Sequence, residues 1–268
     1  MIQINDVTFG YSLEKKVFDG LNLTLSSPGI YGLLGLNGSG KTTLLNLLSS
    51  LFFADQGSIL IDGQDIIKRE TSTLEKIYYM PAKVPETSMK FKDFINYYSP
   101  LYPHFNKEIL QDCLQQFQMN IEERISDLSL GGKKKAFISF ALAVGAEILM
   151  MDEPTDGLDI PSKKIFRQLL MRYVSESQQV IISTHLVGDV ANLLDHFIVL
   201  KKNRKVFSAS TAEITKQYAF VRQLNNENVL YAEPCADGYK VIKSNEGEDT
   251  DIDIELLFRV SSSTFLKL

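Results

Sequence analysis

The sequence predicts an α/β protein in which a mostly parallel sheet is flanked by helices. From about residue 126 to residue 207, short apolar runs alternate with stretches of helical periodicity, an order typical of parallel strands joined by crossover helices. Nearer the N-terminus, a glycine-rich loop separates an apolar run from a leucine-rich stretch. The 268 residues are enough for one large or two small domains with a substantial core.

The composition excludes several classes of protein. A formal net charge of −5 does not indicate a nucleic-acid-binding protein. Cys113 and Cys235 are far apart and form no CxxC motif, so neither a disulfide framework nor a zinc site is expected. The first six residues lack the features of a signal peptide, and every apolar stretch is far shorter than the ~20 residues that span a bilayer. We therefore expect a cytosolic protein.

The N-terminal part is expected to combine antiparallel strands with the start of the parallel sheet. The first thirty residues alternate apolar and polar side chains, which predicts antiparallel strands. A buried strand is expected at 30–35, followed by a helix at 41–51 whose leucines recur at helical spacing. Two further strands are expected at 58–61, before an Asp-Gly turn, and at 77–80, before Pro81.

A helical insertion is expected at about residues 84–145. Helices at 91–102 and 107–119 are followed by a helix at 133–144 that has an apolar face. The first of these helices is rich in aromatic residues, which either belong to the core or line a groove on the surface. These residues are Phe91, Phe94, Tyr97, Tyr98 and Tyr102.

The alternating order continues to about residue 207 and is followed by a region of different character. The elements expected in the alternating part are strands at 148–152, 180–183, 197–200 and 205–207, and helices at 162–175 and near 187–194. We expect a main domain at 1–215 and a small α+β extension at 216–268. A hairpin is expected in the extension, with strands at 229–232 and 239–242, and a terminal helix at 254–260.

The glycine-rich loop, GLNGSGKTT at residues 35–43, fits the P-loop pattern. Its glycines let successive backbone N–H groups point at phosphate oxygens, and the helix that follows adds free N–H groups and a positive dipole end. Lys41 is placed to reach the β- and γ-phosphates of a nucleotide, and Thr42 to bind Mg²⁺. A plain glycine turn would not need the flanking strand and helix, so we expect a P-loop NTPase. The predicted phosphate-binding residues are Gly35, Asn37, Gly38, Ser39, Gly40, Lys41, Thr42 and Thr43.

A second motif lies at the end of the apolar run 148–152. Asp152 and Glu153 follow this strand at the carboxyl edge of the predicted sheet, where such folds bind ligands. Asp152 is expected to hold Mg²⁺, and Glu153 to act as a general base toward an attacking water. The alternative interpretation is that Asp152 and Glu153 are two solvated acids at the end of a strand. The presence of a P-loop in the same chain makes this interpretation less favoured.

Three more motifs complete a resemblance that covers roughly residues 1–208. LSLGGK lies at 128–133, PTDGLD at 154–159 and STH at 183–185, in this order around the Asp-Glu strand. The sequence thereby resembles the nucleotide-binding subunit of ATP-binding cassette (ABC) transporters. The resemblance implies an ATPase in which two subunits, identical or different, face each other head to tail and enclose two ATP molecules.

The resemblance also implies roles for individual residues. Ser129 and Gly131 fall in the signature motif, which in the family meets the γ-phosphate bound by the opposite subunit. Asp159 belongs to the loop that couples the two sites, and His185 matches the switch histidine that orients the attacking water. Tyr11 matches the aromatic residue that stacks on adenine, although an aromatic residue in a turn is more often involved in packing.

The sequence departs from the family pattern at two places. The common signature is LSGGQ, whereas here Leu130 and Gly132 stand at its third and fifth positions. This form resembles the branch of the family that serves many bacterial exporters. A glutamine that touches Mg²⁺ and water normally follows the strand at 77–80, but this position is Ala82. Metal coordination is therefore expected to differ there.

Three lysines, Lys133, Lys134 and Lys135, crowd the start of the helix predicted at 133–144. Cations at a helix N-terminus oppose its dipole by ~0.3–1 kcal/mol each. A triphosphate on the facing subunit would offset this cost, and solvated lysines are the alternative.

These observations predict an ATP- and Mg²⁺-dependent ATPase subunit of a membrane transporter, and they favour export over import. The permease would be a separate integral membrane protein, so the chain would lie on the cytoplasmic face of the membrane. The resemblance implies that the aromatic helix of the insertion lines a groove that receives a short helix of the permease, since such docking needs apolar and aromatic anchors. Two alternatives are a soluble ABC-type ATPase of translation or DNA repair and a regulatory nucleotide switch with weak hydrolysis.

Overall fold

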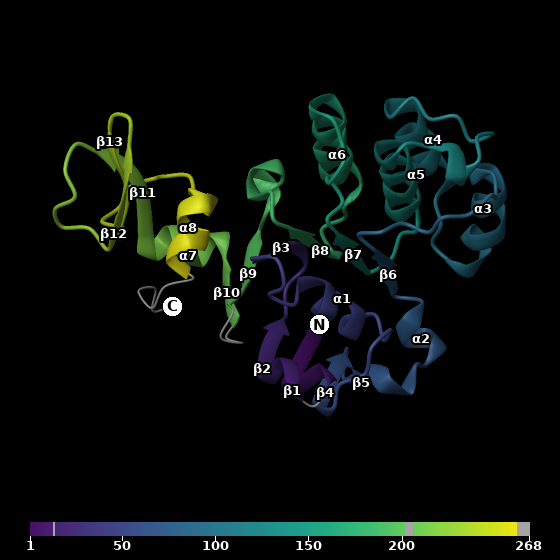
Figure 1. Ribbon diagram of the computed structural model, residues 1–268, viewed down its shortest axis with the longest axis horizontal. Coiled ribbons are helices and arrows are strands. Elements are labelled where there is room, and N and C mark those ends of the chain that lie inside the picture. Colours follow the sequence, from purple (N-terminus) through teal and green to yellow (C-terminus); the bar gives the residue numbers. More distant parts are fainter. Residues whose placement is uncertain (13, 202–205, 262–268) are drawn as a thin grey trace.

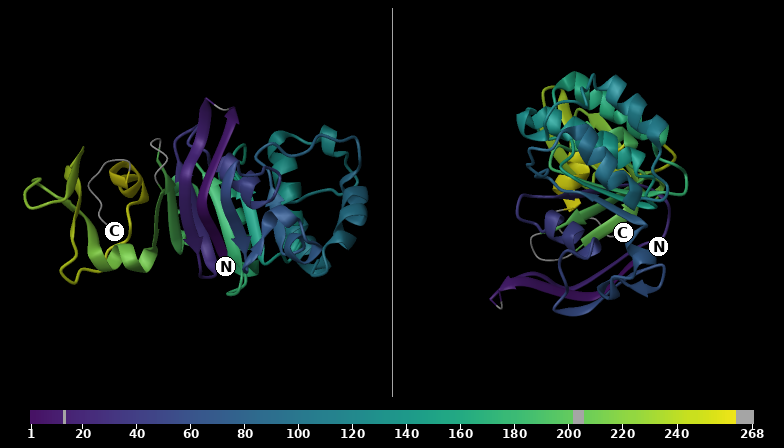
Figure 2. Two further views of the ribbon diagram at one scale, coloured as in Figure 1. Left: turned by 90° about the horizontal axis from the view of Figure 1, so that it is seen from below. Right: turned by 90° about the vertical axis from the view of Figure 1, so that its right-hand side faces the viewer.

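A computed structural model describes residues 1–12, 14–201 and 206–261. The described residues form three sheets, with helices packed around them (Figure 1). A central sheet lies between a layer of helices on one face and an antiparallel sheet beyond the other, and a smaller sheet stands at the C-terminal end (Figures 1 and 2). The predicted combination of a central α/β sheet, an N-terminal antiparallel part and a helical insertion is confirmed.

The N-terminal antiparallel sheet has the strand order β2-β1-β4-β5. Ile2, Ile4 and Val7 of β1 are buried toward the core, and polar residues occupy most of the intervening positions. This alternation is the reason why the sequence identified the strands. The strands are β1 (Ile2–Ser12), β2 (Lys15–Leu25), β4 (Gln56–Ile61) and β5 (Gln64–Asp65).

The central sheet has six strands in the order β10-β9-β3-β8-β7-β6. Every neighbouring pair is parallel except β9 and β10, so the sheet is mostly parallel as predicted. Lys205, the first residue predicted for β10, lies outside the described residues. The strands are β3 (Gly29–Gly35), β6 (Ile77–Met80), β7 (Ile148–Asp152), β8 (Gln179–Thr184), β9 (His196–Leu200) and β10 (Val206–Ser210).

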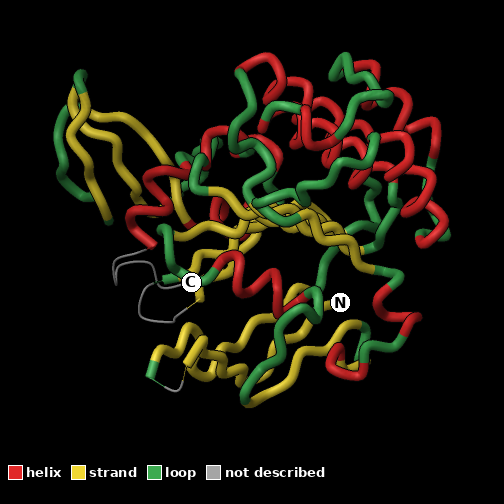
Figure 3. Tube along the Cα trace, turned by 45° about the vertical axis from the view of Figure 1, so that its right-hand side comes forward, coloured by secondary structure: helices red, strands yellow, loops and turns green. Residues whose placement is uncertain are grey.

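Helix α1 (Lys41–Leu48) lies between the central and antiparallel sheets (Figure 3). Its leucines are almost completely buried and belong to one apolar core with residues of both sheets. The helix ends at Leu48 and not at residue 51 as predicted, and Ser50 adopts a positive φ of 55° just beyond this end. Burial on nearly all sides fixes the start of α1, which is where the P-loop ends.

The helical layer covers the other face of the central sheet. It contains α3 (Phe91–Tyr98), α4 (Lys107–Gln116), α5 (Leu130–Ala143) and α6 (Ile160–Tyr173), and a short α2 (Thr71–Leu74) lies apart from them at the edge of the sheets (Figure 1). The predicted helix 91–102 is interrupted after Tyr98 by a 3₁₀ turn that contains Pro100. The predicted helix 133–144 begins three residues earlier, because the Ser129 hydroxyl caps it by accepting from the Gly132 N–H at 3.1 Å.

The helix predicted near 187–194 is wrong. The structure has two separate 3₁₀ turns there, Val187–Asp189 and Ala191–Leu193. Their path is set by contacts with α6, because the Lys163 ammonium lies 2.7 Å from the Asp189 carboxylate and the Arg167 guanidinium donates to the Asp189 carbonyl. The other short 3₁₀ turns are Ile66–Lys68, Ser99–Leu101 and Ile125–Asp127.

The C-terminal region forms a three-stranded antiparallel sheet with the order β11-β13-β12 and two helices. The predicted hairpin is present as β12 and β13, whereas α7 and β11 were not predicted. The division expected between residues 215 and 216 falls inside α7 and stays a prediction. The elements are α7 (Thr211–Gln217), β11 (Tyr218–Gln223), β12 (Tyr231–Cys235), β13 (Gly238–Ser244) and α8 (Ile254–Ser261).

The extension shares its apolar core with the main part of the chain. Leu257 of α8 is completely buried and belongs to the same core cluster as Val190 and Leu194, which follow β8. Helix α8 also contacts the turn Val187–Asp189 directly. Among the described residues, no helix has both the length and the apolar character needed to cross a membrane.

We expect Leu257→Ala to lower the free energy of unfolding of the whole chain by about 2–5 kcal/mol, because it leaves a cavity in a shared core. Urea denaturation followed by circular dichroism measures this change. Leu224→Ala, at a position that is 88% exposed in the same extension, is the matched control and should change it by less than about 0.5 kcal/mol. A separate early transition in Leu257→Ala would show instead that the extension unfolds independently.

Candidate nucleotide-binding site

The P-loop connects the carboxyl end of β3 to the first residue of α1. Gly38 and Gly40 have φ values of 79° and 103°, a region that residues with a side chain rarely adopt. A Cβ atom at Gly40 would also lie 2.9 Å from the side chains of Val17 and Phe18. The loop can therefore follow its tight path against β2 only with glycine at position 40.

Two polar groups of the P-loop are arranged to receive an anion. The Lys41 side chain is buried, and its ammonium donates to the Gly35 carbonyl at 2.9 Å and lies 3.8 Å from the Glu153 carboxylate. The Ser39 hydroxyl is buried and has no hydrogen-bond partner within the described part of the chain. A buried hydroxyl without a partner is costly, and a phosphate oxygen would provide one. The loop thus fits a phosphate group.

Thr42 and Asp152 bring the P-loop and β7 together. The Thr42 hydroxyl donates to Asp152 Oδ2 at 2.7 Å, and the Ser183 hydroxyl of β8 donates to the other carboxylate oxygen. Asp152 is completely buried, so these hydrogen bonds fix its orientation.

The described residues contain no cluster of three or more His, Cys, Asp or Glu side chains that would bind a metal alone. Mg²⁺ in nucleotide sites is bound by one or two protein oxygens together with phosphates and water. The oxygens of Thr42 and Asp152 fit that arrangement, and they would hold the ion beside the phosphates.

Glu153 and His185 meet beside Lys41. The His185 ring nitrogen Nδ1 lies 2.8 Å from Glu153 Oε2, and the Glu153 carboxylate also accepts from the His185 backbone N–H at 3.3 Å. Glu153 has a φ of 45°, a left-handed conformation that costs an L-residue roughly 1–2 kcal/mol. Strain of this kind is typical of functional positions. The carboxylate is placed where it can accept a proton next to a bound phosphate.

A cavity of about 490 Å³ lies beside the P-loop and reaches Glu153. Its walls come from the P-loop, β1, β2 and the end of β7. Tyr11 stands at this cavity, with its hydroxyl 2.8 Å from the Thr43 hydroxyl and its ring edge-on to Phe9 and Phe52. The ring is 58% exposed, and its stacking on adenine stays a prediction. The lining residues are Tyr11, Lys15, Val17, Asn37, Gly38, Gly40, Lys41, Thr42, Thr43 and Glu153.

Three predicted site residues lie elsewhere. Ser129 is the exposed N-cap of α5, and Gly131 lies in its first turn. Asp159 is the N-cap of α6, where its carboxylate accepts from the Ser162 N–H at 2.9 Å. Interactions with Ser162, first with its side chain and then with its backbone N–H, lower the pKa of Asp159. None of the three lines the cavity that contains Lys41. Their action on a nucleotide held by another copy stays a prediction.

The structure adds two residues that the sequence analysis did not assign to the site. Burial and the neighbouring Asp152 carboxylate raise the pKa of the Tyr79 phenol on β6, which keeps it neutral beside the expected metal ligand. Lys134 is completely buried, and its ammonium donates to the Glu153 carbonyl at 2.9 Å. Lys134 is therefore neither solvated nor directed at a facing triphosphate. In the sequence, the only sign of Lys134 was its place in a run of three lysines.

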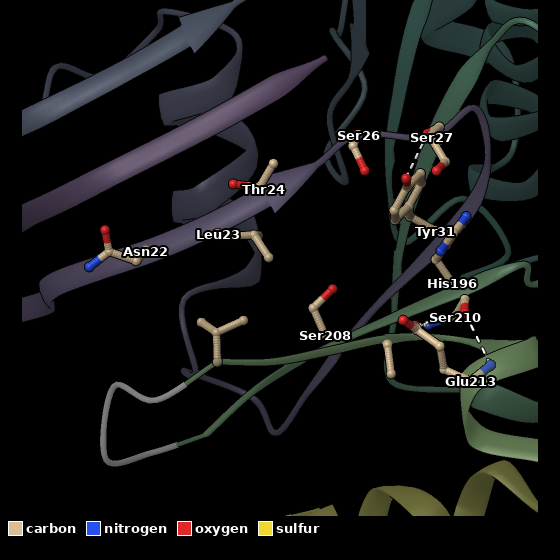
Figure 4. Close-up of a pocket in the computed structure, with 12 residues that line it drawn as sticks. Asn22, Leu23, Thr24, Ser26, Ser27, Tyr31, His196, Ser208, Ser210 and Glu213 are labelled. Atoms are coloured by element: carbon tan, nitrogen blue, oxygen red, sulfur yellow. Dashed lines mark hydrogen bonds between the residues drawn. The ribbon is translucent and has the colours of Figure 1, made fainter. Parts of the chain in front are cut away.

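A second cavity of about 450 Å³ lies between β2 and β10, near the amino ends of β3 and β9 (Figure 4). Its polar walls are already partly paired. The Tyr31 hydroxyl donates to the Ser27 carbonyl, the Tyr31 ring stacks on His196 with a centroid distance of 4.3 Å, and Ser210 and Glu213 form a capping box. The residues predicted for the nucleotide site are all absent from its walls.

Comparison with known proteins identifies the family. A family model described as "ABC transporter" matches residues 18–156, more than half of the chain. The chain belongs to the ABC transporter family. The chain is 31% identical over 219 residues to the ABC transporter ATP-binding protein NatA of Bacillus subtilis; the match covers 77% of this chain and 88% of NatA.

Other ABC proteins show the same relationship. The cytochrome c biogenesis ATP-binding export protein CcmA of Reclinomonas americana is 30% identical over 212 residues, with 76% of this chain and 92% of the relative covered. A solved structure of an ATP-binding subunit of an ABC transporter matches the fold with a TM-score of 0.71 and 19% identity. That match covers 80% of this chain and 91% of the solved chain. The chain is thus an ATP-binding subunit with the ABC cassette fold.

We expect Lys41→Ala to weaken ATP binding at least tenfold, because the change removes the one buried ammonium at the phosphate-binding loop. Isothermal titration calorimetry with Mg-ATP measures the affinity. Lys164→Ala, which removes an exposed lysine on α6, is the control and should bind ATP as the unmodified chain does. An unchanged affinity in Lys41→Ala would remove Lys41 from the phosphate site.

Proposed function

We propose that two ABC subunits enclose two ATP molecules, each bound by the P-loop of one copy and the signature segment of the other. The position of Ser129 carries this proposal. It caps α5 at an exposed position outside the cavity of its own copy, and its hydroxyl proton is free because the oxygen accepts the capping bond. A phosphate presented by a second copy would accept that proton. The second copy is identical or a related subunit.

Hydrolysis would proceed at the contact between Glu153 and His185. Glu153 is placed to accept a proton from water, and the 2.8 Å contact with His185 Nδ1 orients the carboxylate. Lys41 would offset charge on the terminal phosphate oxygens. Mg²⁺, when bound beside Thr42 and Asp152, supplies positive charge that stabilises the developing negative charge on the phosphates.

We further propose that the ATPase drives a separate integral membrane permease, which would hold the chain at the cytoplasmic face of the membrane. Tyr97 at the end of α3 and Leu101 in the 3₁₀ turn that follows are 69% and 61% exposed, whereas Phe91 and Phe94 of α3 are buried. The helix therefore has an apolar surface besides its core face, which fits docking of a short permease helix. Export, rather than import, is supported by the name of the relative CcmA.

Two other functions are less well supported. A soluble ATPase of translation or DNA repair would be expected to bind nucleic acid, for which a net charge of −5 is unfavourable. A nucleotide switch with weak hydrolysis is suggested by Ala82, which has no polar group. The direct contact of Glu153 with His185 favours hydrolysis, because the proposed base is present and oriented.

We expect Glu153→Gln to bind Mg-ATP and to elute as a dimer in size-exclusion chromatography, because an amide cannot accept the proton of the attacking water and ATP remains between the copies. Its ATPase activity should fall at least a hundredfold. Monomeric elution at saturating Mg-ATP would contradict the two-copy site.

The matched control for the dimer is Glu153→Gln combined with Ser129→Arg. The exposed arginine should obstruct the signature face and keep the protein monomeric, while ATP affinity measured by calorimetry stays within about threefold. A dimer that persists in this double variant would show that copies associate through another surface.

We expect the ATPase activity of the chain to rise several-fold when it is reconstituted in vesicles with its permease. The gene of the permease is expected to lie beside the gene of this chain and to encode about six membrane spans. Leu101→Asp should reduce this stimulation, because a charge opposes the docking of an apolar helix. Basal activity of the isolated variant is the control. Activity that stays at background with the permease present would favour the switch instead.

A further inference from the structure

Lys134 is a buried charged residue that the proposed chemistry does not use. Its side chain is 1% exposed, and lysines are almost never buried to this degree unless paired. Its ammonium donates to the Glu153 carbonyl at 2.9 Å and lies in the field of the carboxylates of Asp152, Glu153 and Asp156. The burial lowers the pKa of Lys134, and these acids oppose the shift. This set of contacts opposes the cost of burying the ammonium.

Hydrogen bonds with three residues fix the backbone of Glu153, and Lys134 is one of these residues. The Glu153 N–H donates to the carbonyl and to the hydroxyl of Ser183, each at 3.1 Å. The Glu153 carbonyl accepts from Lys134 and, at 3.3 Å, from the Asp156 N–H. A left-handed residue persists only when its surroundings hold it there. Ser183 of β8 and Lys134 of α5 provide that restraint from two different elements.

The signature residues lie at the N-terminal end of the same helix, just before Lys134. Ser129 caps α5, and Lys134 lies five residues later, about 7 Å along the helix axis. The first turn of α5 also contacts the loop that follows Glu153, because a Cβ atom at Gly131 would lie 2.9 Å from the Gly157 carbonyl. These contacts connect the signature segment with the backbone of Glu153 through the first turns of α5.

We propose that Lys134 is a positioning residue that couples the two nucleotide sites of the dimer. Contact of Ser129 with the nucleotide of the opposite copy would hold α5 in place. Through its hydrogen bond to the Glu153 carbonyl, Lys134 would then fix the base that serves the nucleotide of its own copy. This inference rests on the proposed function, because it requires the signature segment to meet a nucleotide across the dimer.

Three variants separate the hydrogen bond of Lys134 from its charge. Lys134→Met keeps a similar length without a donor or a charge, and Lys134→Gln keeps an N–H donor without the charge. Lys133→Met removes the neighbouring positive charge, which lies 3.8 Å from Glu86 and not at Glu153. In the nucleotide-free chain, hydrogen–deuterium exchange of residues 153–158 should be several-fold faster in Lys134→Met and unchanged in Lys133→Met.

The coupling itself is tested in the Glu153→Gln background, where the closed dimer accumulates. Closure with Mg-ATP should slow exchange at residues 153–158, and Lys134→Met should abolish this slowing while ATP still protects the P-loop. In the chain with Glu153 intact, kcat should fall about tenfold in Lys134→Met with the ATP affinity within twofold. Lys134→Gln should restore most of the slowing of exchange and most of the kcat.

Equal behaviour of Lys134→Met and Lys133→Met would overturn the inference, as would a parallel loss of kcat and ATP affinity. If circular dichroism shows that Lys134→Met does not fold, Lys134→Gln alone decides. Hydrogen–deuterium exchange at residues 153–158 that is several-fold faster than in the unmodified chain overturns the inference. An exchange rate within twofold of the unmodified chain supports it. If Glu153→Gln forms no dimer with Mg-ATP, the proposed function itself fails. A normal dimer whose closure is insensitive to Lys134→Met refutes the coupling alone.

Discussion

Leu33 of β3 pairs with Ser183 of β8, and Ser183 pairs in turn with Asp152 of β7. This row of three residues across parallel strands is the constraint on which the site depends. It brings the start of the P-loop, the hydroxyl that binds Asp152 and the carboxylate that binds Thr42 to one edge of the sheet. A shift of one residue in either pairing would turn Ser183 or Asp152 to the opposite face and separate these groups.

The parts of the fold that the sequence predicted well are those with a strong local signal. The strands around 30–35 and 148–152 are continuous apolar runs because parallel strands are buried on both faces. The P-loop was predictable because its glycines are required by the backbone path, as the close approach of Phe18 to Gly40 shows. Asp152 and Glu153 could be placed because they end a strand whose direction was known.

The parts that could not be predicted depend on contacts between distant elements. The segment after His185 forms 3₁₀ turns because Lys163 and Arg167 of α6 bind Asp189, and no local pattern encodes that contact. Strand β11 (218–223) exists because β13 pairs with it. The burial of Lys134 is equally invisible in a run of three lysines, since only the fold decides which of them faces Glu153.

The conformation of Glu153 has a consequence for protein engineering. At a φ of 45° the backbone by itself would favour glycine or asparagine, so a substitution chosen for thermal stability alone would remove the carboxylate. Stability and activity would therefore favour different residues at this position. Any attempt to produce a heat-resistant form of this subunit for crystallisation or biotechnology should therefore leave residue 153 untouched and seek its gains in the core.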